Sequence, residues 1–297
     1  MSSSHFVVGG VPEHFNAPFH LGMKDGTFAR HGVTLDFVDC LGGTGEMTTK
    51  LNNGELDVAV ALTEGLIAAI AKGEARFKLA AEYCRSPLIW AVSTGANSEV
   101  KSVADLDGKT FGISRFGSGS HIMAIVLAKN NGFVQDNHWR VLRNFQGLRD
   151  GVNTSEADAF LWEKFTTKPF HDTREVVKVG EIVTPWPAFM VAVSDAALQR
   201  EGATEKLAAL FRGIQESCAN FARNDDGASV QYVADKYGNT LDDAAKWFSA
   251  VEFSQDGALS SAVLTNVVSI LKEADVLTAD IHAPPQALVA PALARII

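Results

Sequence analysis

Short apolar segments alternate with segments of helical periodicity along the first two thirds of the chain. Short apolar runs rich in β-branched residues are typical of buried strands, and apolar residues spaced three and four apart are typical of helices. The expected strands are 5–10, 33–39 and 56–62, and the expected helices are 16–32, 43–55 and 64–73. This alternation predicts parallel β-α-β units and therefore an α/β fold.

The middle of the chain repeats the pattern. Residues 109–116 and 139–145 are expected strands, and 120–133 is the expected helix between them. Residues 148–163 also resemble 47–62, because each stretch carries a Glu-x-Asp sequence directly before an apolar run. Similar units in succession indicate two lobes built on one plan.

Two further apolar runs, 86–93 and 187–194, bracket the second repeat, and each is expected to carry the chain between lobes. After Asp195 the pattern is helical to the end of the chain. It is clearest in 204–222 and 260–277, where apolar residues fall on one face at helical spacing. These helices are expected to return and cover the first lobe.

The predicted architecture is therefore a two-lobed α/β protein with two crossovers and a C-terminal helical segment. Lobe 1 is expected to comprise residues 1–92 and 192–297, and lobe 2 residues 93–191. Functional groups in such sheets gather at the carboxyl ends of the strands, and ligands commonly bind between domains. We therefore expect a small-molecule ligand in a cleft between the lobes, which close over it on a hinge.

Composition narrows the function classes. The chain has 297 residues, of which 46% are hydrophobic and 21% charged, as in ordinary globular proteins. The net charge of -9 and the lack of a basic stripe argue against nucleic-acid binding. No apolar run approaches the roughly 20 residues that span a bilayer. The N-terminus lacks the pattern of an export signal, and the three cysteines form no CxxC pair, so a cytoplasmic location is expected. The alternative is a secreted protein from which the export signal has been removed. The sequence carries no signal of oligomeric state.

The sequence Phe116–His121, FGSGSH, lies between an expected strand and an expected helix. Glycines there let the backbone approach a ligand closely, and serine hydroxyls at a helix start either cap the helix or contact a ligand oxygen. A catalytic serine is not expected, because the G-x-S-x-G elbow is absent. The candidate ligand-binding residues of this loop are Arg115, Gly117, Ser118, Gly119, Ser120 and His121.

Further candidates follow other expected strands. Thr44 opens a helix after the second strand. Thr63 and Glu64 are expected to end the third strand and Trp162 and Glu163 the matching strand of lobe 2, so that the two glutamates face each other across the cleft. The two glutamates would accept hydrogen bonds from ligand N–H groups, or only complement a helix dipole. Aromatic side chains near the second crossover either line the pocket or pack in the core. These are Trp186 and Phe189.

Two other sequence signals do not indicate a phosphate-binding or metal-binding site. The sequence GKT at 108–110 resembles the end of a phosphate loop, but position 103 is Val where the motif needs glycine, and it precedes a strand. The histidines have no metal-binding spacing, so no metal site is expected.

A set of short motifs is shared with one known family. The motifs are Lys24, Gly26, Phe28, His31 and Gly32 of one helix end, Gly42–Gly43, and residues 54–59, 102–113 and 157–163. On these motifs, most of residues 5–195 resembles the type II periplasmic-binding-protein family. The resemblance is to the branch that contains aliphatic-sulfonate, taurine and nitrate binding proteins and the yeast-type hydroxymethylpyrimidine synthases of thiamine biosynthesis. An unexported member would resemble intracellular fungal proteins of this fold more than a transporter's receptor.

The resemblance implies a ligand contact at the first loop, where Asn16 stands in this chain. The similar synthases have a histidine there and a cysteine-rich run near the second crossover, whereas residues 184–194 contain no cysteine. A binding protein without cofactor or catalytic residues is therefore expected. The alternatives are an enzyme of thiamine-pyrimidine synthesis, which would use pyridoxal phosphate, and a transporter's sulfonate or taurine receptor.

Overall fold

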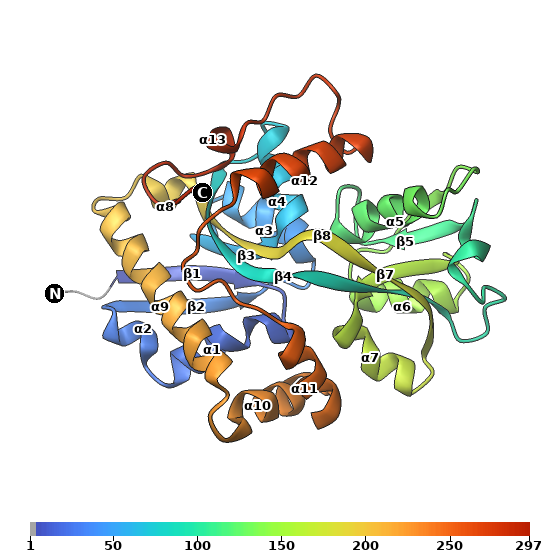
Figure 1. Cartoon of the computed structure of the whole chain (residues 1–297), viewed down its shortest axis with the longest axis horizontal. Helices are drawn as coiled ribbons and strands as arrows, with labels where there is room; N and C mark the ends of the chain where they lie inside the picture. Colours follow the sequence, from blue (N-terminus) through green and yellow to red (C-terminus); the bar gives the residue numbers. More distant parts are fainter. Residues whose placement is uncertain (1–3) are drawn as a thin grey trace. The chain divides into compact units, whose positions relative to one another are not determined.

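The computed structural model describes residues 4–297 and divides into two compact units (Figure 1). The first unit comprises the chain up to Ser86 together with Trp186–Ile297, and the second is Pro87–Pro185. Two long strands, β4 (Phe77–Gly95) and β8 (Val176–Ser194), pass from one unit to the other. The unit boundaries fall inside these strands, whereas the sequence placed them at 92/93 and 191/192, because an apolar pattern does not mark where a continuous strand changes units.

The sheet of the first unit has the strand order β2-β1-β3-β8. Strand β1 (Ser4–Gly10) pairs in parallel with β2 (Val33–Asp39) on one side and β3 (Val58–Leu62) on the other. Residues Phe189–Val193 of β8 pair with β3 in the antiparallel direction. The chain moves outward from β1 to β2 and then back across β1 to β3. Right-handed connections in opposite directions place helices on both faces of the sheet, as the α/β prediction requires.

Helices cover both faces of this sheet (Figure 1). On one face α1 (Ala17–Lys24) and α2 (Thr27–Arg30) pack against α9 (Ala203–Arg223), and on the other α3 (Gly43–Asn52) and α4 (Thr63–Ala71) pack together. The return of C-terminal helices to the first unit is confirmed. The remaining helices of this unit are η1 (His14–Asn16), α8 (Asp195–Leu198), η3 (Asp225–Gly227), α10 (Ala228–Tyr237), α11 (Leu241–Ala250), α12 (Ser261–Glu273) and α13 (Pro285–Leu288).

Two expectations about helices are wrong. The single helix expected over 16–32 is divided at Gly26, whose φ of 76° lies in the left-handed region that glycine adopts readily. The chain is also not helical to its end: beyond Ala274 its one helix among the described residues is the short α13. The C-terminal segment instead pairs with strand-like partners, such as Val289 with Leu79.

The second unit has the strand order β4-β7-β5-β6. Strand β5 (Thr110–Ile113) pairs in parallel with β6 (His138–Val141) and β7 (Ala159–Glu163), and Trp90–Ser93 of β4 pair with β7 in the antiparallel direction. This is the arrangement of the first unit repeated. The helices of this unit are η2 (Val103–Leu106), α5 (Gly119–Asn130), α6 (Phe145–Asn153) and α7 (Lys164–Asp172).

The predicted repeat of 47–62 in 148–163 is confirmed at the level of individual hydrogen bonds. Asp57 precedes β3, and its Oδ2 accepts the backbone N–H of Val7 in β1 at 3.0 Å. Asp158 precedes β7, and its Oδ2 accepts the N–H of Thr110, the first residue of β5, at 2.8 Å. Each carboxylate thus ties the start of one parallel strand to its neighbour.

A second pair of polar residues repeats in the same way. The side-chain amide of Asn52 donates to the carbonyl oxygen of Glu74 at 2.8 Å, just before β4. The amide of Asn153 donates to the carbonyl of Glu175 at 3.0 Å, just before β8. The end of each helix is therefore fixed to the start of the next long strand by the same interaction.

The two repeated segments differ in the residues that cover Asp57 and Asp158. In the first unit the chain continues from β8 into α8, the N–H of Ser194 donates to the carbonyl of Asp57, and the Arg200 guanidinium pairs with the Asp57 carboxylate. Asp57 is only 4% exposed. A nearly buried carboxylate needs such a partner, because an unpaired buried charge is costly.

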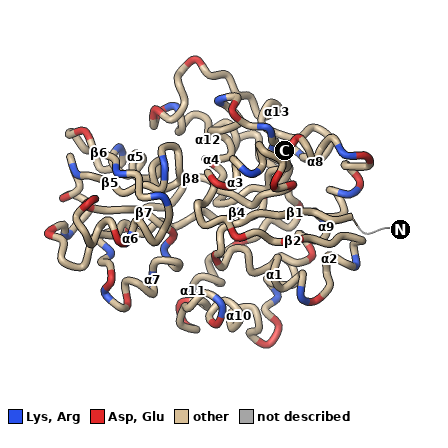
Figure 2. Tube along the Cα trace, turned by 180° about the vertical axis from the view of Figure 1, so that it is seen from behind, with Lys and Arg blue, Asp and Glu red and all other residues tan. Residues whose placement is uncertain are grey.

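The distribution of charges and cysteines does not distinguish the two units. Figure 2 shows Lys and Arg interspersed with Asp and Glu over both units, and within residues 4–297 they form no continuous basic stripe. In the same residues no helix has the length and apolar character needed to cross a membrane. Cys40, Cys84 and Cys218 are buried free thiols.

Replacing Arg200 by Ala should lower the free energy of unfolding by about 1–3 kcal/mol, because the buried Asp57 carboxylate loses its charged partner. Chemical denaturation of the variant and the wild type measures this difference. Arg212→Ala is the matched control, since Arg212 is an exposed arginine of the same unit, in α9. Equal losses in both variants would show that the Arg200–Asp57 pair does not stabilise the unit.

Candidate functional site

The predicted residues of the first unit gather where β3 ends. Thr63 begins α4 directly after β3, and its hydroxyl donates to the carbonyl of Pro187 at 2.5 Å. Thr44, near the start of α3, accepts the N–H of Leu62 on its Oγ1 at 3.2 Å. The Thr44 methyl lies against Gly65, where an added Cβ would come within 2.7 Å of it. The two helix starts are therefore locked together around the strand end.

Glu64 is fully buried at this strand end. Its Oε2 accepts the indole N–H of Trp186 at 2.9 Å, while its Oε1 is buried and has no hydrogen-bond partner among residues 4–297. Burial raises the pKa of Glu64 to about 7. A carboxyl group held in this way can accept a hydrogen bond when ionised or donate one when protonated.

Asn16 lies at the adjacent strand end. Its amide nitrogen donates to the carbonyl of Val11 at 2.7 Å, and it packs so closely on Gly10, the last residue of β1, that an added Cβ would lie 2.6 Å from Nδ2. The Asn16 Oδ1 is buried, again without a hydrogen-bond partner in the described chain. Because buried oxygens are normally paired, Asn16 and Glu64 each present an acceptor that the protein itself does not use.

Aromatic rings surround the first loop. Phe189 packs on Phe15 with ring centroids 4.8 Å apart, and His14 meets Trp247 of α11 edge-on at 4.5 Å. Burial lowers the pKa of His14 to about 3, so the ring is neutral. The sequence pattern pointed to Phe189 but not to His14 or Trp247, because their contact joins segments more than 200 residues apart and no local pattern indicates it.

The FGSGSH sequence of the second unit forms the predicted turn into a helix. Ser118 is the N-cap of α5 and accepts the N–H of His121 at 3.3 Å, while its own hydroxyl lies 2.7 Å from the carbonyl of Arg115. Ser120 Oγ accepts the N–H of Ser114 at 3.0 Å. Both hydroxyls therefore have partners within the loop: Ser118 caps α5, whereas Ser120 holds the backbone of Ser114, and direct ligand contact of either stays a prediction.

Gly117 and Arg115 shape the rest of this loop. Gly117 has a φ of 73°, which favours glycine, and its N–H donates to Nδ1 of His121 at 3.0 Å. Gly119 is the first residue of α5. Arg115 donates to the carbonyl of Phe116 at 3.3 Å and has no acidic partner in residues 4–297. Burial lowers the pKa of Arg115, but a guanidinium remains charged.

Trp162 and Glu163 end β7 as expected, yet they are not the counterparts of Thr63 and Glu64. Glu163 is the N-cap of α7, and its Oε2 accepts the N–H of Thr166 at 2.6 Å. Glu64 instead lies inside the first turn of its helix. The two strands end at equivalent residues, Leu62 and Glu163, so Glu64 lies two residues beyond the position that Glu163 occupies. Trp162 stacks on Phe145 at 5.2 Å.

The two strand-end groups offer complementary chemistry. The buried oxygens of the first unit have the chemistry to accept N–H groups, and Arg115 with the N-terminus of α5 has the chemistry to bind an anionic group. Within the described residues no three His, Cys, Asp or Glu side chains lie close enough together to hold a metal ion.

Comparison with known proteins gives the same fold. A family model described as Ca3427-like PBP matches residues 90–182. The Candida albicans CA3427 gene product, described as defining a new family with the generic periplasmic-binding-protein fold, is 31% identical. The alignment covers 99% of this chain and 97% of that one, with a TM-score of 0.89. No curated protein matches the chain significantly.

More distant structures share the fold. The alkanesulfonate-binding protein SsuA from Xanthomonas axonopodis pv. citri, bound to MOPS, is 16% identical over 99% of both chains, with a TM-score of 0.76. The nitrate-binding protein NrtA from Synechocystis PCC 6803 is 11% identical over 94% of this chain and 83% of its own, with a TM-score of 0.72.

The raised pKa of Glu64 predicts a specific pH dependence. The folded state holds the Glu64 proton up to about pH 7, whereas the unfolded chain releases it near the ordinary glutamate pKa of 4.5. Stability from this group is therefore fully present below pH 4.5 and is lost as the pH rises to 7, by about 3 kcal/mol. Glu64→Gln should not show this loss in denaturation curves recorded across that range.

The difference between wild type and variant is the quantity to compare, because His14, His20 and His171 also have lowered pKa values and titrate in both proteins. Their contribution has the opposite sign, since stability from a histidine kept neutral is lost as the pH falls. Parallel stability profiles for the two proteins would mean that Glu64 titrates normally.

Proposed function

Because the chain belongs to the CA3427 family of proteins with the periplasmic-binding-protein fold, we propose that it binds a small polar or heterocyclic molecule without transforming it. The ligand takes contacts from the strand ends of both units, and the units close over it on a hinge. No cofactor takes part in this binding.

The observation that carries the proposal is the pair of unused acceptors in the first unit. Glu64 Oε1 and Asn16 Oδ1 are both buried without hydrogen-bond partners in residues 4–297. Leaving a buried polar atom unpaired costs about 1–3 kcal/mol, so a ligand that supplies N–H donors stabilises the protein at these points. A ring nitrogen, an amino group or an ammonium group has this chemistry.

The second unit supplies the complementary contact. Arg115 and the start of α5 favour a negatively charged group, because helix N–H groups in the first turn have no helical partner. The similar proteins SsuA and NrtA are described as binding an alkanesulfonate and nitrate, which are anions. A ligand with an anionic group and N–H donors, such as an aminosulfonate or a substituted pyrimidine, combines both requirements.

The hinge is proposed at the two places where β4 and β8 change units. Pro87 and Pro185 lie at these boundaries and have no N–H to donate to a strand ladder. Backbone positions with fewer ladder hydrogen bonds deform more readily than the rest of a strand.

The thiamine-pyrimidine synthase alternative has no specific support. Residues 184–194 form part of β8 and contain no cysteine, and the resemblance to the synthases implies that Asn16 stands where they have a histidine. Consumption of pyridoxal phosphate in the presence of iron would nevertheless favour the synthase over the binding protein.

A thermal-shift panel identifies the ligand class. Taurine, ethanesulfonate, an aminopyrimidine phosphate and pyridoxal phosphate should be tested with the whole chain, and a molecule with both N–H donors and an anionic group should raise Tm most. Arg115→Met should then weaken binding of that molecule about tenfold or more, measured by calorimetry, because its anionic group loses a charged partner.

Arg140→Met is the matched control, since Arg140 is exposed and pairs with Glu156 outside the strand-end loops. It should leave the affinity unchanged. A panel without any shift in Tm, or equal losses of affinity in the two variants, would contradict the proposed ligand contacts.

Hinge closure predicts a more compact molecule with ligand bound. Small-angle X-ray scattering should show a smaller radius of gyration when saturating ligand is added to the wild type. Arg115→Met at the same ligand concentration should show no change. Identical scattering curves for free and bound wild type would rule out closure while leaving binding itself untouched.

A further inference from the structure

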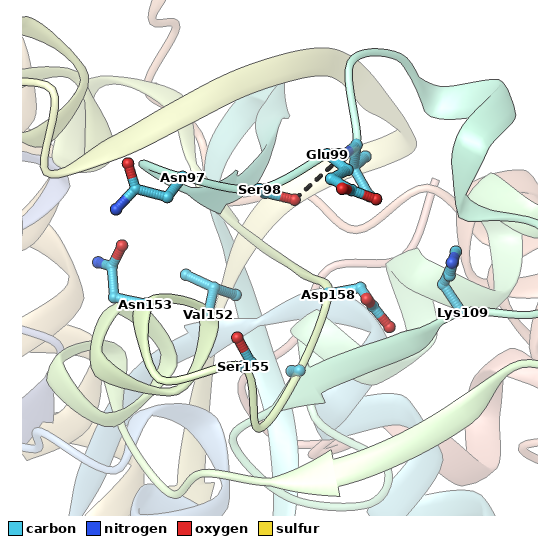
Figure 3. A pocket seen from close by; sticks show the side chains of 10 residues that line it. Asn97, Ser98, Glu99, Lys109, Val152, Asn153, Ser155 and Asp158 are labelled. Atoms are coloured by element: carbon cyan, nitrogen blue, oxygen red, sulfur yellow. Dashed lines mark hydrogen bonds between the residues drawn. The ribbon is translucent and has the colours of Figure 1, made fainter.

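A polar cavity of about 260 Å³ lies in the second unit at the starts of β5 and β7. Figure 3 shows Asn97, Ser98 and Glu99 along one side of it, and Asn153, Ser155 and Asp158 along the other, with Lys109 at one end. The cavity lies at the amino ends of these parallel strands, whereas the predicted ligand contacts lie at their carboxyl ends. It is therefore separate from the proposed binding site.

In the first unit the corresponding position is occupied by the protein's own residues. Asp57 is the counterpart of Asp158, and each accepts a backbone N–H on Oδ2. The other oxygen of Asp57 binds the guanidinium of Arg200, and α8 covers the neighbouring turn, with the Ala196 methyl 3.7 Å from the Cβ position of Gly54. A guanidinium is thus the group that this arrangement binds when the chain supplies one.

The second unit does not supply a guanidinium to Asp158. Lys101 lies as many residues after the end of β4 as Arg200 lies after the end of β8, but its ammonium donates to the carbonyl of Ser98 at 2.7 Å, within its own loop. Lys109 forms no ion pair in the described chain. The Oδ1 of Asp158 and the carboxylate of Glu99 therefore line an open cavity without the cation that Asp57 has.

We propose that this cavity is a second binding site, specific for a small molecule that carries a guanidinium group. The planar guanidinium donates to Asp158 Oδ1 as Arg200 donates to Asp57. Its remaining N–H groups face the Glu99 carboxylate, which lies across the cavity from Asp158 (Figure 3). Asn97 and Asn153 lie at the opposite end of the cavity from Asp158 and Lys109 (Figure 3), and their amide N–H groups bind a carboxylate at the far end of the ligand, so free arginine matches the whole cavity.

Calorimetric titration of the whole chain with L-arginine tests this site, with L-citrulline as a neutral isostere of the same shape. Arginine should bind with a dissociation constant below about 1 mM, and citrulline at least tenfold more weakly. Asp158→Asn should weaken arginine binding at least tenfold, because the Asn oxygen keeps the hydrogen bond from Thr110 and the amide N–H₂ then faces the ligand.

Glu156→Gln is the matched control, since Glu156 lies two residues before Asp158, pairs with Arg140 and does not line the cavity. It should leave arginine binding unchanged. Glu99→Gln, at an exposed residue whose side chain makes no hydrogen bond to residues 4–297, gives a second test if Asp158→Asn does not fold. Equal binding of arginine and citrulline, or arginine binding unaffected by either cavity variant, would overturn the proposal. Neither outcome bears on the strand-end site.

Discussion

The two long strands β4 and β8 constrain everything else in this protein. Each is one continuous strand whose two parts belong to different units, so the second unit is held by backbone at both its start and its end. Pro87 and Pro185 lie at the two unit boundaries and have no N–H to donate to a strand ladder, which is why the proposed hinge is placed there.

The polar groups at the strand ends follow from the same topology. Parallel strands bring their carboxyl ends to one edge, where helix starts and loops meet and the core cannot supply enough partners. Glu64 shows the energetic consequence, because it is wholly buried with a single hydrogen bond from Trp186 and its pKa rises to about 7. A buried carboxyl group with an unpaired oxygen is tolerated where a bound molecule completes its hydrogen bonds. This property distinguishes a binding site from an ordinary apolar core.

The sequence was sufficient for the α/β alternation, the repeat and the return of the C-terminal helices, because these depend on local periodicity. It was insufficient where distant segments meet. The bond from Trp186 to Glu64 and the contact of Trp247 with His14 join residues far apart in the chain. Periodicity also left the offset between Glu64 and Glu163 undetected, since a small shift at a strand end changes the role of a side chain without changing the apolar pattern.

The burial of all three cysteines has a consequence for thiol chemistry. Burial raises the pKa of Cys40 to about 11 and of Cys84 to about 12, and that of Cys218 further still, so none forms the reactive thiolate at neutral pH. A cysteine introduced at an exposed position would therefore be the thiol that maleimide reagents modify. Paired fluorophores can then be attached to the two units, and their separation followed in solution, without first removing the native residues.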